Sequence, residues 1–103
     1  MVKYTTPTFS LTLPNEVDLT DATNVYATFS ATGLEITKSG ADLTVSAHQV
    51  DVFFTQDETA KFPVGSMRIQ LNWTYQEGGI AKRACSEIAT VNVTPNLLDE
   101  VVA

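Results

Sequence analysis

MRIQLNWTYQ, at residues 67–76, alternates without a break between apolar and polar side chains. This period of two is the pattern of a β-strand that buries one face. Ten residues in such a strand extend over about 33 Å. The residues of one parity are therefore predicted to form a wall of the hydrophobic core, and these are Met67, Ile69, Leu71, Trp73 and Tyr75.

Shorter segments with the same period lie on both sides of this strand. They are residues 9–13, 24–31, 34–37, 43–47, 50–54 and 82–94. Turn-forming residues separate them about every 8–12 residues, which is typical of a β-sandwich. We therefore expect an all-β fold, an Ig-like antiparallel β-sandwich of about seven strands. The parity shifts near His48 and Gln49, which indicates a bulge or a chain crossing between sheets.

One segment breaks the β pattern. Thr55 and Glu58 have the spacing of a capping box, in which each side chain accepts a hydrogen bond from the backbone N–H of the other residue. Residues 60–62 complete the turn, and Pro63 and Gly65 end it. The sequence predicts one short helical turn that links two strands.

The length of 103 residues fits one domain. We assign residues 1–95 to a single β-sandwich domain and residues 96–103, which follow Pro95, to a C-terminal tail. The tail combines apolar residues with two carboxylates. Two interpretations stay open, because such a segment either docks on a neighbouring protein or is a frayed end.

Twelve acidic residues against six basic ones give a formal net charge of −6. This charge repels phosphate backbones and anionic membranes, so neither nucleic acid nor a membrane is an expected partner. Cys85 is the only cysteine, so no intrachain disulfide can form. No apolar run has the length of a signal peptide or a membrane span. We expect synthesis in the bacterial cytoplasm, and the sequence leaves open a later place in a virion.

The residues needed for catalysis are scarce. His48 is the only histidine, and its neighbours form no nucleophile elbow or oxyanion loop. One cysteine and one histidine do not make a zinc site, and the acidic residues lack the spacing of a calcium loop. Gly78 and Gly79 lack the Lys and Ser/Thr of a phosphate loop. We therefore expect no enzyme, no cofactor and no metal; an enzyme that uses His48 is the least favoured alternative.

Two surfaces are candidates for protein contacts, and both stand against the simpler interpretation of a solvated surface. The first is the polar face of the long strand, with Arg68, Gln70, Asn72 and Thr74. The second is the tail, with Leu98, Asp99, Glu100 and Val101. Exposed edge strands offer a further route to association, because they can accept an added strand.

Three short motifs, taken in order, resemble a known group of proteins. Residues 5–14 read TTPTFSLTLP, residues 55–62 read TQDETAKF, and residues 98–101 read LDEV. In this order they resemble short β-sandwich proteins encoded among the tail and structural genes of phages and prophages of Gram-positive bacteria. The chain is also similar to the N-terminal domain of phage baseplate upper proteins. It departs from the group in lacking a Gly before Thr5 and in its longer polar stretch at residues 18–24.

The resemblance implies an Ig-like sandwich that works as a virion or tail-assembly component. We therefore expect a non-enzymatic phage or prophage structural protein, of the tail or baseplate type. It would assemble through contacts with other phage structural subunits or with itself. The alternative is an Ig-like recognition module for carbohydrate or a cell surface. That module would need its aromatic side chains exposed together on one flank, with Tyr26, Phe53, Phe54 and Tyr75 as candidates.

Overall fold

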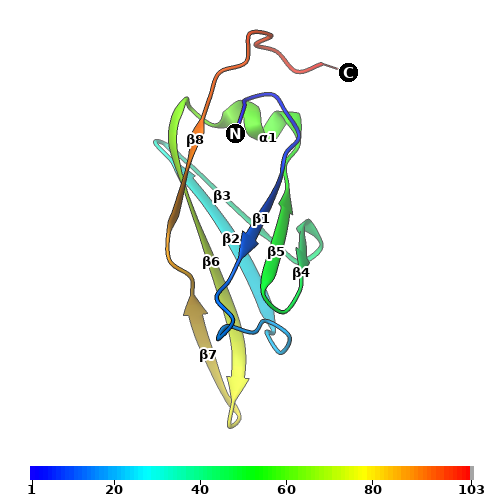
Figure 1. Cartoon of the computed structure of the whole chain (residues 1–103), viewed down its shortest axis with the longest axis vertical. Coiled ribbons are helices and arrows are strands. Elements are labelled where there is room, and N and C mark those ends of the chain that lie inside the picture. The colour runs from blue at the N-terminus through cyan, green and yellow to red at the C-terminus, as the bar shows by residue number, and fades with distance from the viewer. Residues whose placement is uncertain (103) are drawn as a thin grey trace.

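The computed structural model describes residues 1–102, and it consists of two antiparallel β-sheets packed face to face (Figure 1). Ala103, the last residue of the predicted tail, lies outside the described residues. The strands are β1 (Thr8–Thr12), β2 (Asn24–Ala31), β3 (Leu34–Ser39), β4 (Leu43–Val45), β5 (Gln49–Phe53), β6 (Gly65–Glu77), β7 (Ile80–Cys85) and β8 (Ala89–Val93). The helical segments are a 3₁₀ turn at Gly40–Asp42 and the α-helix α1 (Gln56–Lys61). The expected all-β sandwich is confirmed.

The small sheet has the order β1-β5-β4, and the large sheet has the order β3-β2-β6-β7 with β8 also paired to β6. These are the orders B-E-D and C′-C-F-G of an immunoglobulin-type sandwich. Within residues 1–102 no strand corresponds to strand A, which in that fold lies beside B. The outer edge of β1 is consequently open.

The alternation of apolar and polar side chains along β6 determines which of its residues enter the hydrophobic core. Its odd-numbered residues face the small sheet, and Met67, Ile69, Leu71 and Trp73 are all less than a tenth exposed. The core is completed by apolar residues of the same inward parity on the neighbouring strands, mainly Val25, Ala27 and Phe29 from β2 and Val50 and Val52 from β5. Four rings, those of Phe9, Phe29, Phe54 and Phe62, pack at tilted or edge-to-face angles in its upper part.

The long return strand predicted at residues 82–94 is wrong in one respect, since it is two strands. A two-residue turn reverses the chain after β6, with Gly78 at φ 58° and Gly79 at φ 79°, as a type I′ hairpin requires. β7 then pairs with the lower half of β6 and β8 with the upper half. Between them, residues 86–88 leave the ladder, and the side chain of Ile88 turns out to solvent.

Two further boundaries differ from the sequence prediction. The parity shift near His48 is neither a bulge nor a crossing, because β4 and β5 form a hairpin and residues 46–48 are its turn. Lys38 and Ser39 belong to β3 rather than to a turn, and Lys38 points inward. The hydrophobicity pattern did not predict this end of β3, because lysine is rarely buried and a polar residue at an inward position interrupts the alternation.

The helical turn forms where the capping box predicts it. The Glu58 N–H donates to Thr55 Oγ1 over 3.3 Å, and the Thr55 N–H donates to Glu58 Oε1 over 2.9 Å. Phe62, the residue that follows the last residue of α1, is fully buried. Of the helices in residues 1–102, none is long and apolar enough to cross a membrane.

Candidate protein–protein interface

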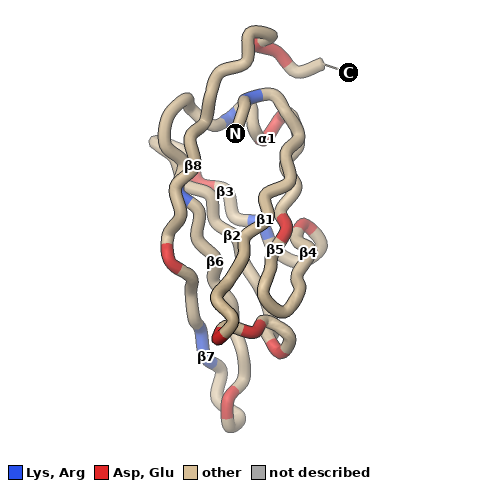
Figure 2. The backbone as a smooth tube through the Cα atoms, viewed as in Figure 1, with Lys and Arg blue, Asp and Glu red and all other residues tan. Residues whose placement is uncertain are grey.

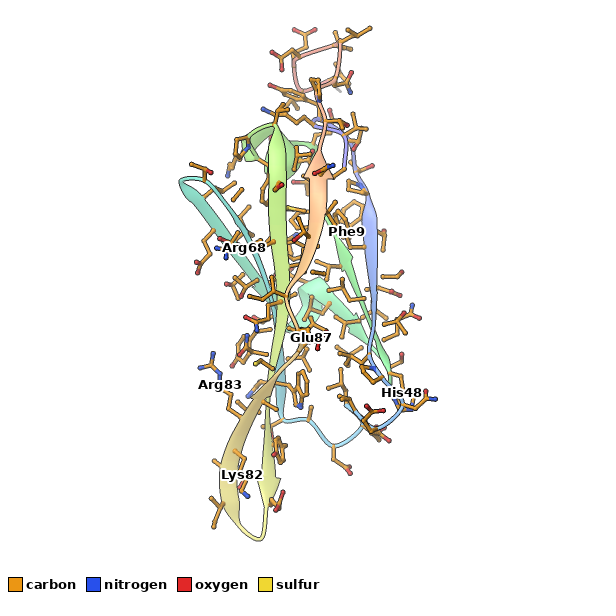
Figure 3. All side chains as sticks on the ribbon, turned by 60° about the vertical axis from the view of Figure 1, so that its left-hand side comes forward. Phe9, His48, Arg68, Lys82, Arg83 and Glu87 are labelled. Atoms are coloured by element: carbon orange, nitrogen blue, oxygen red, sulfur yellow. The ribbon has the colours of Figure 1, made fainter. Side chains whose placement is uncertain are left out.

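The outer face of the large sheet carries the polar residues of β6. Strand register places Asn72 between Tyr26 of β2 and Cys85 of β7, and Gln70 beside Thr28. Figure 3 shows Arg68 and Arg83 on the same side of this sheet. The prediction that these side chains share one face is therefore met by the strand geometry.

Most polar groups of this face are already paired within the chain. Arg83 donates through Nε and Nη2 to Asn72 Oδ1, over 3.2 and 3.0 Å. Gln70 Nε2 donates to the Ser86 carbonyl over 2.9 Å. The Arg68 side chain is exposed and has no hydrogen bond or ion pair to any other residue of the described chain. The Thr74 side chain, which is part-exposed, likewise has no such contact within residues 1–102, so Arg68 and Thr74 are the members of the predicted set that a partner could bind without displacing an internal side-chain contact.

The tail folds back over the end of the sandwich that carries α1 (Figure 1). The side-chain amide of Gln56 in α1 makes two hydrogen bonds to the Val102 backbone. Its Nε2 donates to the Val102 carbonyl over 2.8 Å, and its Oε1 accepts from the Val102 N–H over 3.0 Å. Asn96 Nδ2 donates to the Lys3 carbonyl. Tyr4 binds Asp99, and this hydrogen bond raises the pKa of the Tyr4 phenol.

The apolar side chains of the tail remain in solvent despite these contacts. Leu97 is fully exposed, and Leu98 and Val101 are about half exposed. The tail and the outer face of β6 do not form one surface, because the tail contacts the N-terminal segment and α1 rather than the large sheet. The two predicted surfaces are separate.

The structure contains a groove that sequence reasoning missed. It lies between β1 of the small sheet and the β7–β8 break of the large sheet, and its volume is about 630 Å³. The walls are mainly apolar, with Leu11, Leu13, Val17, Ile69, Leu71 and Trp73, and the rim carries Glu87 and Ile88. The sequence held one sign of this groove. Ile88 does not share the inward parity of Ala89, Val91 and Val93, and it marks the place where the chain between β7 and β8 leaves the sheet.

β1 presents an open backbone edge to this groove. The Phe54 N–H donates to the Pro7 carbonyl and the Leu13 N–H donates to the His48 carbonyl, so the odd-numbered residues of β1 bond to β5. In an antiparallel pair the intervening residues direct their N–H and C=O groups the other way. Thr8, Ser10 and Thr12 therefore point these groups away from β5, and within residues 1–102 no other strand pairs with them.

The other sheet edges are protected in ways that natural β-proteins commonly use. β7 carries Lys82 and Arg83, β3 carries Glu35, and β4 has three residues only. The C-terminal end of β8 is covered by the N-terminal segment, since the Met1 ammonium donates to the Asn92 carbonyl and the Thr94 N–H donates to the Met1 carbonyl. β1 has no charged residue, so its tube is tan in Figure 2. It also has no proline, and within residues 1–102 no strand pairs with its outer edge.

The ionisable side chains of residues 1–102 are spread over the molecule. His48 lies in the turn between β4 and β5, and its Nδ1 is 2.6 Å from the Val17 carbonyl. Figure 3 shows His48 apart from Glu87 at the rim of the groove. Hydrogen bonds from the Thr20 side chain and backbone hold the pKa of the neighbouring Asp18 carboxyl below its usual range. Among residues 1–102 no three His, Cys, Asp or Glu side chains gather as a metal site.

The aromatic residues named for carbohydrate binding are dispersed. Phe54 is fully buried, and Tyr75 is half-buried on the inner face of β6. Tyr26 lies on the outer face of the large sheet. Phe53, the one that is half exposed, has the outward parity of β5 in the small sheet. These residues do not make a common platform.

Comparison with known proteins returns no match. No protein-family model, no curated protein and no solved structure matches this chain. The likeness to phage tail proteins thus stays a hypothesis based on short motifs, and the geometry of the surface carries the functional argument.

Proposed function

We propose that this chain is a non-enzymatic structural protein of a phage or prophage, of the tail or baseplate type, which acts by assembling with other protein subunits. The observation that carries the proposal is the open edge of β1 beside an apolar groove. An unpaired strand edge can form backbone hydrogen bonds with an added strand. Apolar side chains of that strand would be stabilised by burial in the groove beside it. Both features suit a subunit that is completed by a neighbour.

Other features support the same interpretation. The exposed apolar side chains of the tail, Leu97 and Leu98 among them, lie at one end of an elongated molecule of 52 × 25 × 22 Å. The Arg68 side chain adds an unpaired charge on the polar outer face of the large sheet. Surfaces of this kind bind proteins by shape and by a few anchors, and they need no converging ionisable groups.

The test is recovery of the chain in particles. The source bacterium is induced for its prophage, particles are purified on a density gradient, and their proteins are identified by mass spectrometry. We expect the chain to sediment with tail or whole particles in a fixed ratio to their major subunit, and deletion of its gene to yield incomplete tails. Normal particles that never contain the chain and do not change on its deletion would refute the proposal.

The carbohydrate-binding alternative has weaker support, because its aromatic residues lie on different faces. A glycan array with the purified chain and its Tyr26→Ala and Phe53→Ala variants separates the two functions. We expect no glycan signal above background. A signal that these variants abolish would favour the recognition module instead.

A further inference from the structure

We propose that β1 pairs antiparallel with β1 of a second copy of this chain, so that two small sheets join into one continuous sheet across a two-fold axis at Ser10. This inference deepens the proposed function and rests on it only in taking protein assembly as the role of the β1 edge. The partner it names is a second copy of the same strand.

The backbone of β1 determines what kind of partner fits. Thr8, Ser10 and Thr12 direct their N–H and C=O groups outward in a row, and only another extended strand satisfies such a row. The side chains of these residues lie on the outer face of the small sheet and are exposed. The strand that pairs here needs no helix, loop or ligand chemistry.

The sequence of β1 allows β1 of a second copy to be the strand that pairs with it. Thr8-Phe9-Ser10-Leu11-Thr12 is nearly symmetric about its centre, with a hydroxyl residue at every even position and an apolar one at every odd position. An antiparallel pair centred on Ser10 sets hydroxyls opposite hydroxyls and Phe9 opposite the Leu11 of the second copy. Both kinds of pair stabilise a sheet, and an isologous interface requires this self-complementarity.

The surroundings of the strand favour the same pairing. Leu11 lines the groove, and the second copy's apolar residues extend the cover over its open side. The contact strand has no charge, so the net charge of −6 on each copy acts only at a distance. Asp51 is the nearest carboxylate to Ser10, and three strand spacings, about 14 Å, separate the two Asp51 residues of a pair.

The test compares two lysine substitutions that flank the same Asp51. Ser10→Lys places a charge on β1 at the two-fold axis, while Thr44→Lys places it on β4, at the opposite edge of the same sheet. Both positions are exposed and both lysines can pair with Asp51, so both variants should fold, which circular dichroism confirms. Sedimentation equilibrium of the full chain is measured from about 10 μM to 1 mM, the range for a small interface.

We expect wild type and Thr44→Lys to dimerise with affinities within about twofold of each other, and Ser10→Lys to dimerise at least about tenfold more weakly, because like charges directly opposite destabilise a strand pair. Mixing Ser10→Lys with Ser10→Glu should restore a dimer with one copy of each. A wild-type monomer at every concentration, equal dimerisation of the two lysine variants, or a mixture that stays monomeric would overturn the pairing.

These outcomes are independent of the test for the proposed function. A chain that is monomeric in solution but present in tail particles would refute the β1 pairing and leave the proposed function standing. A dimer that Ser10→Lys disrupts, in a chain absent from all particles, would support the pairing and refute the phage role.

Discussion

Lys38 of β3 and Glu58 of α1 form an ion pair, with 2.8 Å between Nζ and Oε1. The Lys38 ammonium also donates to the Phe53 carbonyl over 2.6 Å and lies 4.5 Å from the centre of the Phe54 ring. Its side chain is 9% exposed and that of Glu58 is 25% exposed. The pair thus connects the edge of the large sheet to the helix that follows the small sheet.

Lys38→Met should lower the free energy of unfolding at pH 7 by about 3 kcal/mol, because it leaves a partly buried carboxylate without its partner. The measurement is urea unfolding of dilute protein. Lys82→Met is the control, since the Lys82–Glu77 pair is solvent-exposed and should contribute about 0.5 kcal/mol at most. Equal losses for the two variants would contradict this account of the pair.

Acid should remove the difference between wild type and Lys38→Met. Burial raises the pKa of the Glu58 carboxyl, but hydrogen bonds from Lys38 and from the Thr55 N–H outweigh burial and hold that pKa below its usual value of 4.5. A lowered pKa in the folded state gives stability that is present above about pH 4.5 and is lost as the pH falls through the folded-state value. The gap in the free energy of unfolding between the two proteins should therefore be clearly smaller at pH 3 than at pH 7. A gap that is as wide at pH 3 as at pH 7 would show that packing, not charge, explains it.

Trp73→Ala should be severely destabilising, by about 3–5 kcal/mol, because the Trp73 side chain is 8% exposed and fills the lower core. Asn72→Ala, one residue away on the outer face, should cost about 1 kcal/mol or less, since Asn72 only accepts a surface bond from Arg83. Thermal unfolding of both variants makes the comparison. A milder effect at Trp73 than at Asn72 would mean that the two faces of β6 are assigned the wrong way round.

The sequence was sufficient for the sandwich because strand alternation is a local property. The inward parity of Met67 to Trp73 and the capping box of Thr55 and Glu58 need only near neighbours to be read. The inward Lys38 could not be predicted in this way, because its partner Glu58 is twenty residues distant along the chain. A charged residue at an inward position is intelligible only once that partner is known.

The candidate interface was predictable only in part, for a related reason. Parity grouped the outward residues of β6 on one face, namely Arg68, Gln70, Asn72 and Thr74. It could not show that Gln70 and Asn72 are paired to Ser86 and Arg83. The groove depends on which strand lies beside β1, and strand order is a property of the whole fold. Sequence could identify β1 as a strand without showing that its edge is open.

Removal of residues 97–103, which is all but the first residue of the predicted tail at 96–103, should change the free energy of unfolding by about 1 kcal/mol or less and tests whether the tail stabilises the domain. Leu97 is fully exposed, and Leu98 and Val101 are about half exposed. The two Gln56–Val102 hydrogen bonds that the deletion removes lie at the surface, and the Asn96 bond to Lys3 is kept. The measurement is urea unfolding of the shortened chain beside the full chain. A loss of several kcal/mol would place the tail within the folded domain.

Salt should strengthen self-association. Each copy carries a net charge of −6, whereas the residues of β1 are uncharged, so screening reduces the repulsion between copies without weakening the contact. We expect the dimer affinity to rise about threefold or more between roughly 20 mM and 500 mM NaCl, in sedimentation runs at constant pH. A dimer that dissociates as salt is added would instead indicate a contact made by opposite charges, such as Arg68 with the acidic tail.

The most direct measurement of the β1 edge is a disulfide between copies. In a Cys85→Ser background, Ser10→Cys should give a covalent dimer on mild oxidation, because directly opposed residues in a hydrogen-bonded antiparallel pair have Cα atoms about 5.5 Å apart, within disulfide range. Thr44→Cys, at the other edge of the same sheet, should stay mainly monomeric on non-reducing gels under the same conditions. Cross-linking of Thr44→Cys as fast as Ser10→Cys, or no covalent dimer of Ser10→Cys at all, would contradict association through the open edge of β1.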